Sequence, residues 1–153
     1  MDPQRRPAWS LFFNAECAVA AHSRPTLELM LVESERFESK KAMPKGWEDG
    51  VLRYCDILGV SFEGGGPSGA LIACTFEDCD WYWALFNIAT FVDVTFRRCE
   101  FSGVSFSGCR FVECTFEDCR FTDDSFGKPC SFNENSWYKC ELVRTSKPVG
   151  GLR

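Results

Sequence analysis

The most regular feature of the chain is an aromatic side chain at every fifth position from residue 76 to residue 126. The series comprises Phe76, Trp81, Phe86, Phe91, Phe96, Phe101, Phe106, Phe111, Phe116, Phe121 and Phe126. A small or compact residue stands two positions earlier in a companion series, Cys74, Cys79, Ala84, Ala89, Val94, Cys99, Val104, Cys109, Cys114 and Cys119, which ends with Asp124. Self-similarity at a short fixed period predicts a stacked repeat architecture.

A spacing of five fits neither of the two common regular structures. On an α-helix, successive members of the series would be rotated by about 140° from one another, so no single face could collect them. On a straight strand, an odd spacing sends alternate members to opposite faces. Both conflicts disappear if the chain turns a corner every five residues, because four such corners close a square coil that stacks on the next.

The repeats resemble those of the pentapeptide-repeat family, whose consensus has a Leu or Phe at its centre and a small residue two positions earlier, both pointing inward. Residues 114–118, Cys-Thr-Phe-Glu-Asp, match the Phe/Cys variant of that consensus. The resemblance implies an all-β fold, a right-handed quadrilateral parallel β-helix, whereas the spacing alone indicates only the five-residue turn.

The register extends on both sides of the unbroken series. Upstream it is kept by Leu52, Ile57 and Phe62, and the run 64–68 is read as an inserted loop before Leu71. Downstream, 127–129 is read as adding one residue before Phe132, Trp137 and Leu142. The sequence therefore predicts four to five coils over residues 51–143, preceded by an N-terminal cap or extension at 1–50 and followed by a flexible tail at 144–153.

Residues 1–50 lack the repeat but contain two apolar stretches, 9–13 and 26–32. The second of these favours a strand. Because the end of a solenoid exposes core side chains and unpaired backbone, we expect this region to cap the N-terminal end or to cover one face. The alternative is that it forms part of a partner-specific surface.

Stacking the coils with both insertions removed predicts which residues lie above one another. One core column is expected to contain Leu52, Phe76, Phe96, Phe116 and Trp137, and the column beside it Cys55, Cys79, Cys99, Cys119 and Cys140. Two surface columns then read Arg53, Glu77, Arg97, Glu117 and Tyr54, Asp78, Arg98, Asp118, Lys139. Opposite charges would face each other across neighbouring strands, which is favourable.

The 10 Cys of the chain are interpreted as structural thiols, since Cys is among the most often buried residue types. Parallel side chains in stacked coils are about 4.8 Å apart, further than the ~3.8 Å that separates the Cβ atoms of a disulfide. A zinc site needs four converging ligands, which a column of parallel side chains does not supply. We therefore expect no metal site and no cofactor.

Charge and hydropathy narrow the class of protein. The net charge of −5 disfavours direct nucleic-acid binding, because phosphate recognition needs a basic surface. No apolar run has the length of a membrane span. The apolar stretch 8–21 follows Arg5 and Arg6 but is interrupted by Asn14 and Glu16, so it is not read as an export signal. A cytoplasmic protein is expected.

No catalytic constellation can be assembled from the sequence. The only histidine is His22, outside the repeats, so no Ser-His-Asp or Cys-His set is available. The glycine-rich run 64–69 lacks the Lys and the helix of a phosphate loop and predicts a turn. Carboxylate pairs such as Glu117 and Asp118 fit surface ion pairing beside arginines. The chain is therefore predicted not to be an enzyme.

Two outward-facing surfaces are candidates for partner binding. The first consists of aromatic and apolar side chains whose column neighbours are small, so that they should protrude as interface anchors: Tyr82, Trp83 and Ile88. The N-terminal region could equally cover them. The second is an apolar stripe beside an acidic one, for which a solvated face is the alternative: Val92, Val112, Asp93, Glu113 and Glu134.

The family resemblance implies two kinds of protein partner. Some bacterial pentapeptide-repeat proteins protect DNA gyrase by imitating duplex DNA as long, acidic, dimeric rods, and others accompany toxins as immunity proteins. This chain predicts a short rod of modest charge with arginines on its faces, and residues 145–153 offer no apolar dimerisation helix. The favoured hypothesis is a monomeric immunity protein that neutralises a cognate toxin, such as a type VI secreted nuclease effector. Protection of gyrase or topoisomerase is the alternative.

Overall fold

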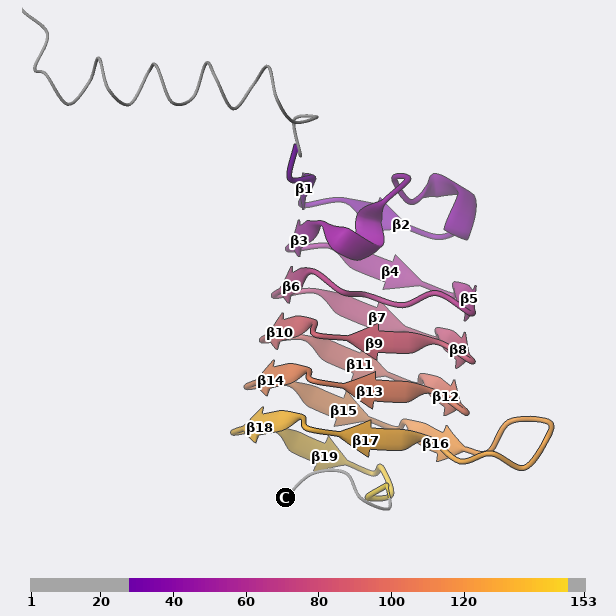
Figure 1. Ribbon diagram of the computed structural model, residues 1–153. Helices are drawn as coiled ribbons and strands as arrows, with labels where there is room; N and C mark the ends of the chain where they lie inside the picture. The colour runs from indigo at the N-terminus through magenta and orange to yellow at the C-terminus, as the bar shows by residue number, and fades with distance from the viewer. Residues whose placement is uncertain (1–27, 149–153) are drawn as a thin grey trace, which may run out of the picture.

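The computed structural model describes residues 28–148 and shows a four-sided rod of short strands (Figure 1). Every strand pairs in parallel with the strand one coil away, and side chains at the same position of successive coils lie in register. The predicted fold class, an all-β parallel solenoid, is confirmed, with about five turns. No helix of the described part is long and apolar enough to cross a membrane.

Four parallel sheets form the sides of the rod, named here A to D. Side A contains β1 (Leu31–Glu33), β3 (Val51–Arg53), β6 (Ala70–Ile72), β10 (Thr90–Val92), β14 (Arg110–Val112) and β18 (Ser136–Tyr138). Side B contains β2 (Arg36–Phe37), β4 (Asp56–Leu58), β7 (Thr75–Glu77), β11 (Thr95–Arg97), β15 (Thr115–Glu117) and β19 (Glu141–Val143). Side C contains β5 (Ser61–Glu63), β8 (Asp80–Tyr82), β12 (Glu100–Ser102) and β16 (Arg120–Thr122). Side D contains β9 (Leu85–Asn87), β13 (Ser105–Ser107) and β17 (Ser131–Asn133).

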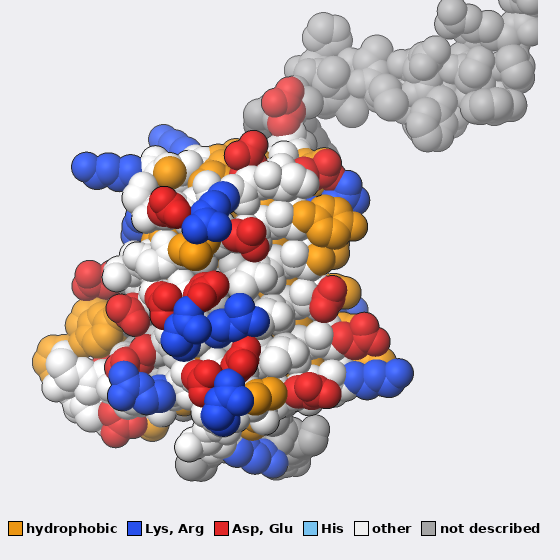
Figure 2. Space-filling model, turned by 180° about the vertical axis from the view of Figure 1, so that it is seen from behind, with side chains coloured by type: hydrophobic (Ala, Val, Ile, Leu, Met, Phe, Trp, Pro, Cys, Tyr) orange, Lys and Arg blue, Asp and Glu red, His pale blue; other side chains and the backbone are white. Residues whose placement is uncertain are grey.

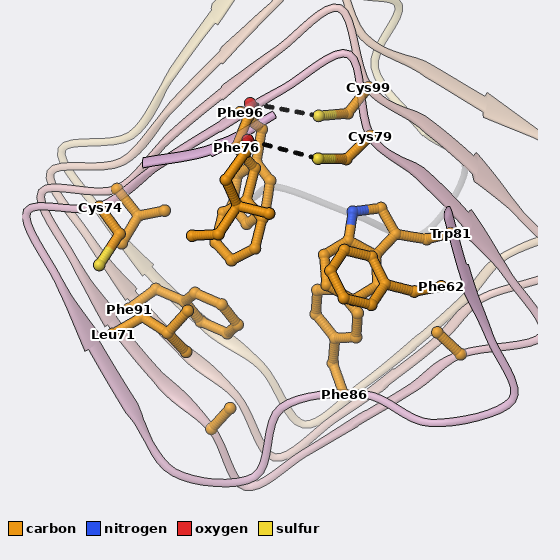
Figure 3. Packing of buried hydrophobic residues seen from close by; sticks show 14 of the residues in the cluster. Phe62, Leu71, Cys74, Phe76, Cys79, Trp81, Phe86, Phe91, Phe96 and Cys99 are labelled. Atoms are coloured by element: carbon orange, nitrogen blue, oxygen red, sulfur yellow. Dashed lines mark hydrogen bonds between the residues drawn. The ribbon is translucent and has the colours of Figure 1, made fainter. Parts of the chain in front are cut away.

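Aromatic rings from the four sides fill the interior of the rod. Figure 3 shows Phe86, Phe91 and Phe96 reaching inward from successive sides, and all three are completely buried. Between coils the rings stack, as in Phe91 and Phe111, whose centroids are 4.7 Å apart at an interplanar angle of 4°. Around one coil they meet edge to face, as in Phe96 and Phe101 at 5.6 Å and 69°. Such pairs contribute about 0.5–1.5 kcal/mol each beyond the area they bury.

The corners explain how the chain turns every five residues. At most corners one residue adopts a left-handed backbone conformation, for example Asp78 at φ 54° and Asp93 at φ 53°. This conformation is disfavoured for residues with a Cβ atom. Where another coil follows, such a residue gains a hydrogen bond to it. For example, the Asp78 N–H donates to the Arg97 carbonyl at 3.0 Å and the Asp93 N–H to that of Val112 at 2.9 Å.

The glycine-rich run 64–68 forms one side of a coil and is not an extra loop. It contains no strand, but it lies along β9, where the Asn87 N–H donates to the Pro67 carbonyl at 3.3 Å. A Cβ at Gly66 would approach the Leu85 carbonyl oxygen to 2.4 Å, so only glycine fits there. Leu52 consequently pairs with Leu71 and not with Phe76, and this end of the predicted core column is wrong.

Between β16 and β17 the chain leaves the rod in a loop, residues 123–130, that projects from its side (Figure 1). The loop is longer than the predicted one-residue insertion. Trp137 therefore stacks on Phe111 at 4.1 Å, and not above Phe116 as predicted. Phe126 was predicted in the core, but its side chain is 80% exposed. This assignment is wrong because the chain turns outward at Asp124, as described below.

The longer loop also moves residues at the corners. The Glu113 N–H donates to the Tyr138 carbonyl, so Lys139 follows Glu113 in its column and does not follow Asp118. Its predicted place beside Asp118 is taken by Arg144. Cys140 lies in the column of Cys114 and not in that of Cys119, as its partner Phe111 O, at 3.4 Å, shows. Cys55 is likewise displaced, and neighbours Cys74.

The N-terminal part of the described chain continues the rod beyond the boundary predicted at residue 51. β1 and β2 stack in register on β3 and β4, and β1 overlaps the end of the stretch 26–32 that was predicted as a strand. Two short 3-10 helices follow, η1 (Lys40–Ala42) and η2 (Trp47–Asp49). The buried Trp47 ring packs 5.4 Å from that of Phe62. The other predictions for this region, including the stretch 9–13 and His22, lie outside the described residues.

The cysteines of the described chain are free and hold neighbouring coils together. The Cys99 thiol donates to the Phe76 carbonyl at 3.3 Å, and the Cys119 thiol to that of Phe96 at 3.1 Å. In the last coil the Thr145 hydroxyl makes the same contact, 2.9 Å from the Phe116 carbonyl. Burial raises the pKa of Cys74 to about 11, so its thiol keeps its proton at neutral pH. No group of side chains among residues 28–148 is placed to hold a metal ion.

Candidate protein-binding surface

The outer surface of side B is a network of ion pairs. Arg97 lies between Glu77, at 3.9 Å, and Glu117, at 2.8 Å. Arg98 pairs with Asp78 at 2.8 Å and also contacts Glu77. Figure 2, which views the rod from the side opposite to Figure 1, shows acidic and basic side chains interleaved on that face. The carboxylates of Glu77, Asp78 and Glu117 are thus matched by cations from a neighbouring coil.

The same network continues to the last coil, where Arg144 is 2.8 Å from Glu117 and 2.7 Å from Asp118. Hydrogen bonding from Arg144 holds the pKa of Asp118 below its usual value. The predicted alternation of charge is therefore found at Glu77, Arg97 and Glu117, but its ends were misassigned. Arg53 is on side A and pairs with Glu33.

Side D differs from side B because none of its three strands carries a charged residue. Its outward-facing positions are all neutral: Leu85, Asn87, Ser105, Ser107, Ser131 and Asn133. A partner can therefore cover these strands without removing a charged group from water, which would be costly. Depletion of charge is also what distinguishes the core of a protein interface from the rest of a surface.

Large apolar side chains border side D at the level of β9. Trp83 stands at the corner with side C and Ile88 at the corner with side A, and they are 44% and 70% exposed. Leu85, between them on β9, is 47% exposed. Two of the three residues predicted for the first surface, Trp83 and Ile88, thus flank one strand of side D. The third, Tyr82, stacks on Trp83 with centroids 5.0 Å apart.

The loop 123–130 adds a third aromatic residue, Phe126, beside Tyr82 and Trp83. The ring of Phe126 stacks on that of Trp83, with centroids 5.7 Å apart and an interplanar angle of 15°. We refer to Tyr82, Trp83 and Phe126 as the aromatic edge. The sequence analysis did not identify Phe126 and Leu85 as surface residues. The five-residue series places Phe126 in the core, and Leu85 is a single apolar residue that nothing in the sequence distinguishes.

Asp124 fixes the position of the aromatic edge. One carboxylate oxygen accepts hydrogen bonds from the backbone N–H groups of Phe126 and Lys128, each at 2.8 Å. The other accepts the indole N–H of Trp83 at 2.8 Å. The Lys128 N–H, with smaller contributions from Trp83 and Phe126, holds the pKa of Asp124 below its usual value. An Asp where the companion series otherwise has a small residue was the available signal for this loop.

The second predicted surface is only partly assembled. Val92 and Val112 lie next to each other on side A, and Asp93 and Glu113 occupy the adjacent corner. Glu134 is not among them. The Gly108 N–H donates to the Asn133 carbonyl, which places Glu134 beyond Gly108 at the corner between sides D and A. The residue that follows Glu113 is Lys139, so the stripe is less acidic than predicted.

Comparison with known proteins agrees with the fold. Residues 93–134 match the family model described as pentapeptide repeats (9 copies). The pentapeptide-repeat protein Rfr23 from the cyanobacterium Cyanothece 51142 has a similar structure, with 11% identity and a TM-score of 0.52 over 78% of this chain and 85% of that one. QnrB1, a plasmid-mediated fluoroquinolone resistance protein, has 14% identity and a TM-score of 0.46 over 76% of this chain and 67% of that one. No curated protein matches the chain in sequence.

Proposed function

Because the solenoid of this chain is a pentapeptide-repeat domain, we propose that the protein acts without catalysis, by binding another protein through side D and its aromatic edge. The observation that carries the proposal is the combination of a charge-free face with exposed Trp83, Leu85, Ile88 and Phe126 along its border. Exposed aromatic anchors beside neutral surface are typical of protein interfaces. A large apolar patch on a rigid scaffold is also costly to leave in water.

Of the two partner classes that the family resemblance implies, we propose a toxin, bound by one copy of this chain in the cytoplasm. A protein that imitates DNA needs a face of unmatched negative charge. On side B the carboxylates of Glu77, Asp78 and Glu117 are instead paired with arginines. Side D carries no charge on its strands. These two faces favour recognition of a neutral, apolar protein surface over imitation of a phosphate backbone.

The proposal is tested by titrating the purified chain with the toxin encoded beside its gene and measuring the complex by calorimetry and size-exclusion chromatography. We expect a one-to-one complex that Trp83→Ala weakens by about thirtyfold or more, as for an interface hot spot. Tyr138→Ala is the matched control, since Tyr138 is a similarly exposed aromatic residue, 57% exposed, on side A.

Other outcomes would redirect the proposal. Weakening by Glu113→Lys but not by Trp83→Ala would place the interface on the second surface, with Val92, Asp93 and Val112. Relief of quinolone inhibition of gyrase by the purified chain, without a toxin complex, would favour the alternative partner class.

A further inference from the structure

The aromatic edge and side D border a hollow of about 490 Å³. Its lining comes from two successive coils and the projecting loop: Trp83, Ala84, Leu85, Gly103, Ser105, Asp124, Phe126 and Lys128. Volumes of a few hundred Å³ are typical of sites that hold a side chain or a small ligand. Most of the lining is apolar or small, so the hollow is suited to an apolar group.

Gly103 keeps the hollow open. A Cβ on Gly103 would lie 2.7 Å from the Cβ of Asp124, and the backbone there has φ +59°, which side-chain-bearing residues rarely adopt. Its neighbours along the corner are Trp83 on one side and Asp123 on the other, so the glycine is a gap between larger residues. The absence of a side chain at this position lets the loop and Trp83 meet across the hollow.

The carboxylate that lines the hollow is already hydrogen-bonded. The Asp124 carboxylate accepts three hydrogen bonds, from the indole of Trp83 and from two backbone N–H groups of the loop. The other charged residue of the lining, Lys128, has the opposite sign. A basic side chain entering the hollow would lose water and meet a carboxylate whose oxygens are already hydrogen-bonded. An acidic side chain could pair with Lys128 only by coming close to the Asp124 carboxylate, which Lys128 already attracts. An apolar side chain would lose nothing and would cover exposed ring surface.

Phe126 is the part of the lining with most to gain from a partner. Its ring is 80% exposed although it stacks on Trp83, and removing the apolar surface of a Phe ring from water is favourable. The loop holds the ring in place through the hydrogen bond from its own N–H to Asp124, at 2.8 Å. A partner therefore meets a preformed surface and does not have to order the loop.

We propose that this hollow is the anchor pocket of the interface and that it receives one large aliphatic or aromatic side chain from the surface of the partner protein. The inference rests on the proposed function and adds the chemistry of the group that is recognised. Phe126 and Leu85 are then specificity-determining residues, because they set which side chain fits. Neutral residues of the partner surface around that side chain lie over the Ser and Asn side chains of side D.

The test needs no partner protein. The full chain, labelled with ¹⁵N, is titrated by NMR with N-acetyl-leucinamide and N-acetyl-phenylalaninamide, and in parallel with the α-amides of N-acetyl-aspartate and N-acetyl-lysine. We expect saturable shifts of the Trp83 indole N–H resonance with the two apolar probes and binding at least about tenfold weaker with the charged ones. Phe126→Ala is expected to weaken the apolar probes by a similar factor, and Tyr138→Ala to leave them unchanged.

Absence of saturable shifts, equal binding of charged and apolar probes, or unchanged binding to Phe126→Ala would each overturn the anchor pocket. These outcomes are distinct from failure of the proposed function, which is the absence of any toxin complex. A complex that forms but is unaffected by Phe126→Ala would remove the pocket and leave the function standing.

Discussion

Phe121 and Phe126 are consecutive members of the same five-residue series, yet they lie in opposite environments. The ring of Phe121 stacks on that of Phe101 inside the rod, with centroids 4.9 Å apart, whereas Phe126 is 80% exposed. The difference begins two residues earlier. The Cys119 thiol points inward and donates to a core carbonyl, but the carboxylate of Asp124 cannot be buried among rings without great cost. It binds backbone N–H groups of the loop instead, and the chain turns outward.

The residues that follow Phe126 also favour its position outside the core. If Phe126 occupied the core, continuing the spacing of five would bring Ser131, Ser136 and Glu141 into the interior. With Phe126 outside, the next three core positions are taken by Phe132, Trp137 and Leu142. Compared with an unbroken spacing of five, three apolar side chains are gained for the exposure of one ring. The one-residue insertion predicted from the sequence would keep all four inside, but it would also turn Asp124 toward the core, which is costly. A strict period therefore predicts the core only where the following residues support it.

The largest expected effect on stability is the difference between two variants that each introduce an aspartate into the five-residue series, one inside the rod and one outside it. Phe106→Asp would bury a carboxylate among stacked rings and remove a completely buried side chain, so we expect an unfolded or aggregated protein. Phe126→Asp should give a soluble solenoid with nearly the wild-type melting temperature. Circular dichroism during thermal unfolding measures both. Similar melting temperatures for the two variants would contradict the distinction.

A smaller effect is expected from filling the gap beneath the loop. Gly103→Ala combines an unfavourable backbone conformation, at φ +59°, with a contact of 2.7 Å to Asp124, and should cost more than the roughly 1 kcal/mol expected for strain alone. Gly127→Ala is the matched control, because Gly127 has φ +79° but nothing within 4 Å of its added Cβ. Urea denaturation gives both free energies of unfolding, and equal losses would show that the contact with Asp124 is unimportant.

The fold followed from the sequence because the five-residue period is a local property, repeated many times. The register at the two ends did not, because it depends on how the chain spans 64–68 and 123–130. A glycine-rich run can form one side of a coil or project from it as a loop. Its composition does not distinguish the two arrangements. The errors at Leu52, Trp137 and Glu134 all have this origin.

Part of the candidate surface could be predicted from the sequence, because it too depends on the local five-residue period. Trp83 and Ile88 could be placed outside from their distance to the core positions. Asp124 was a signal that the chain leaves the rod near Phe126. The stacking of Phe126 on Trp83 could not be predicted, because it depends on the hydrogen bond between Asp124 and Trp83, which are far apart in the chain. The neutrality of side D could have been seen by comparing its outward positions, such as Ser105 and Ser107, with those of side B.

Acid should loosen the loop before the core. The pKa of Asp124 in the folded chain lies below its ordinary value of 3.8, so its contribution to loop stability is fully present above that value. The contribution is lost as the pH falls through the lower folded-state pKa. We expect the Trp83 indole N–H resonance to move in that range while core amides stay protected from exchange. Asp124→Asn should lack this titration, and movement of Trp83 only together with global unfolding would contradict the assignment.

The smallest effect is expected on side B, where the surface is charged but the contacts are exposed. Arg98→Gln removes pairs with Asp78 and Glu77, and the Arg98 side chain is 48% exposed. Exposed ion pairs contribute little, and salt screens them. We expect the melting temperature to fall less than in Gly103→Ala, and the difference from wild type to shrink as salt is added. A loss as large as that of Gly103→Ala, or one insensitive to salt, would mean that the outer charges position the coils. In that case the surface charges, and not only the packing of the core, would help to decide which members of the series, such as Phe121, lie inside and which, such as Phe126, lie outside.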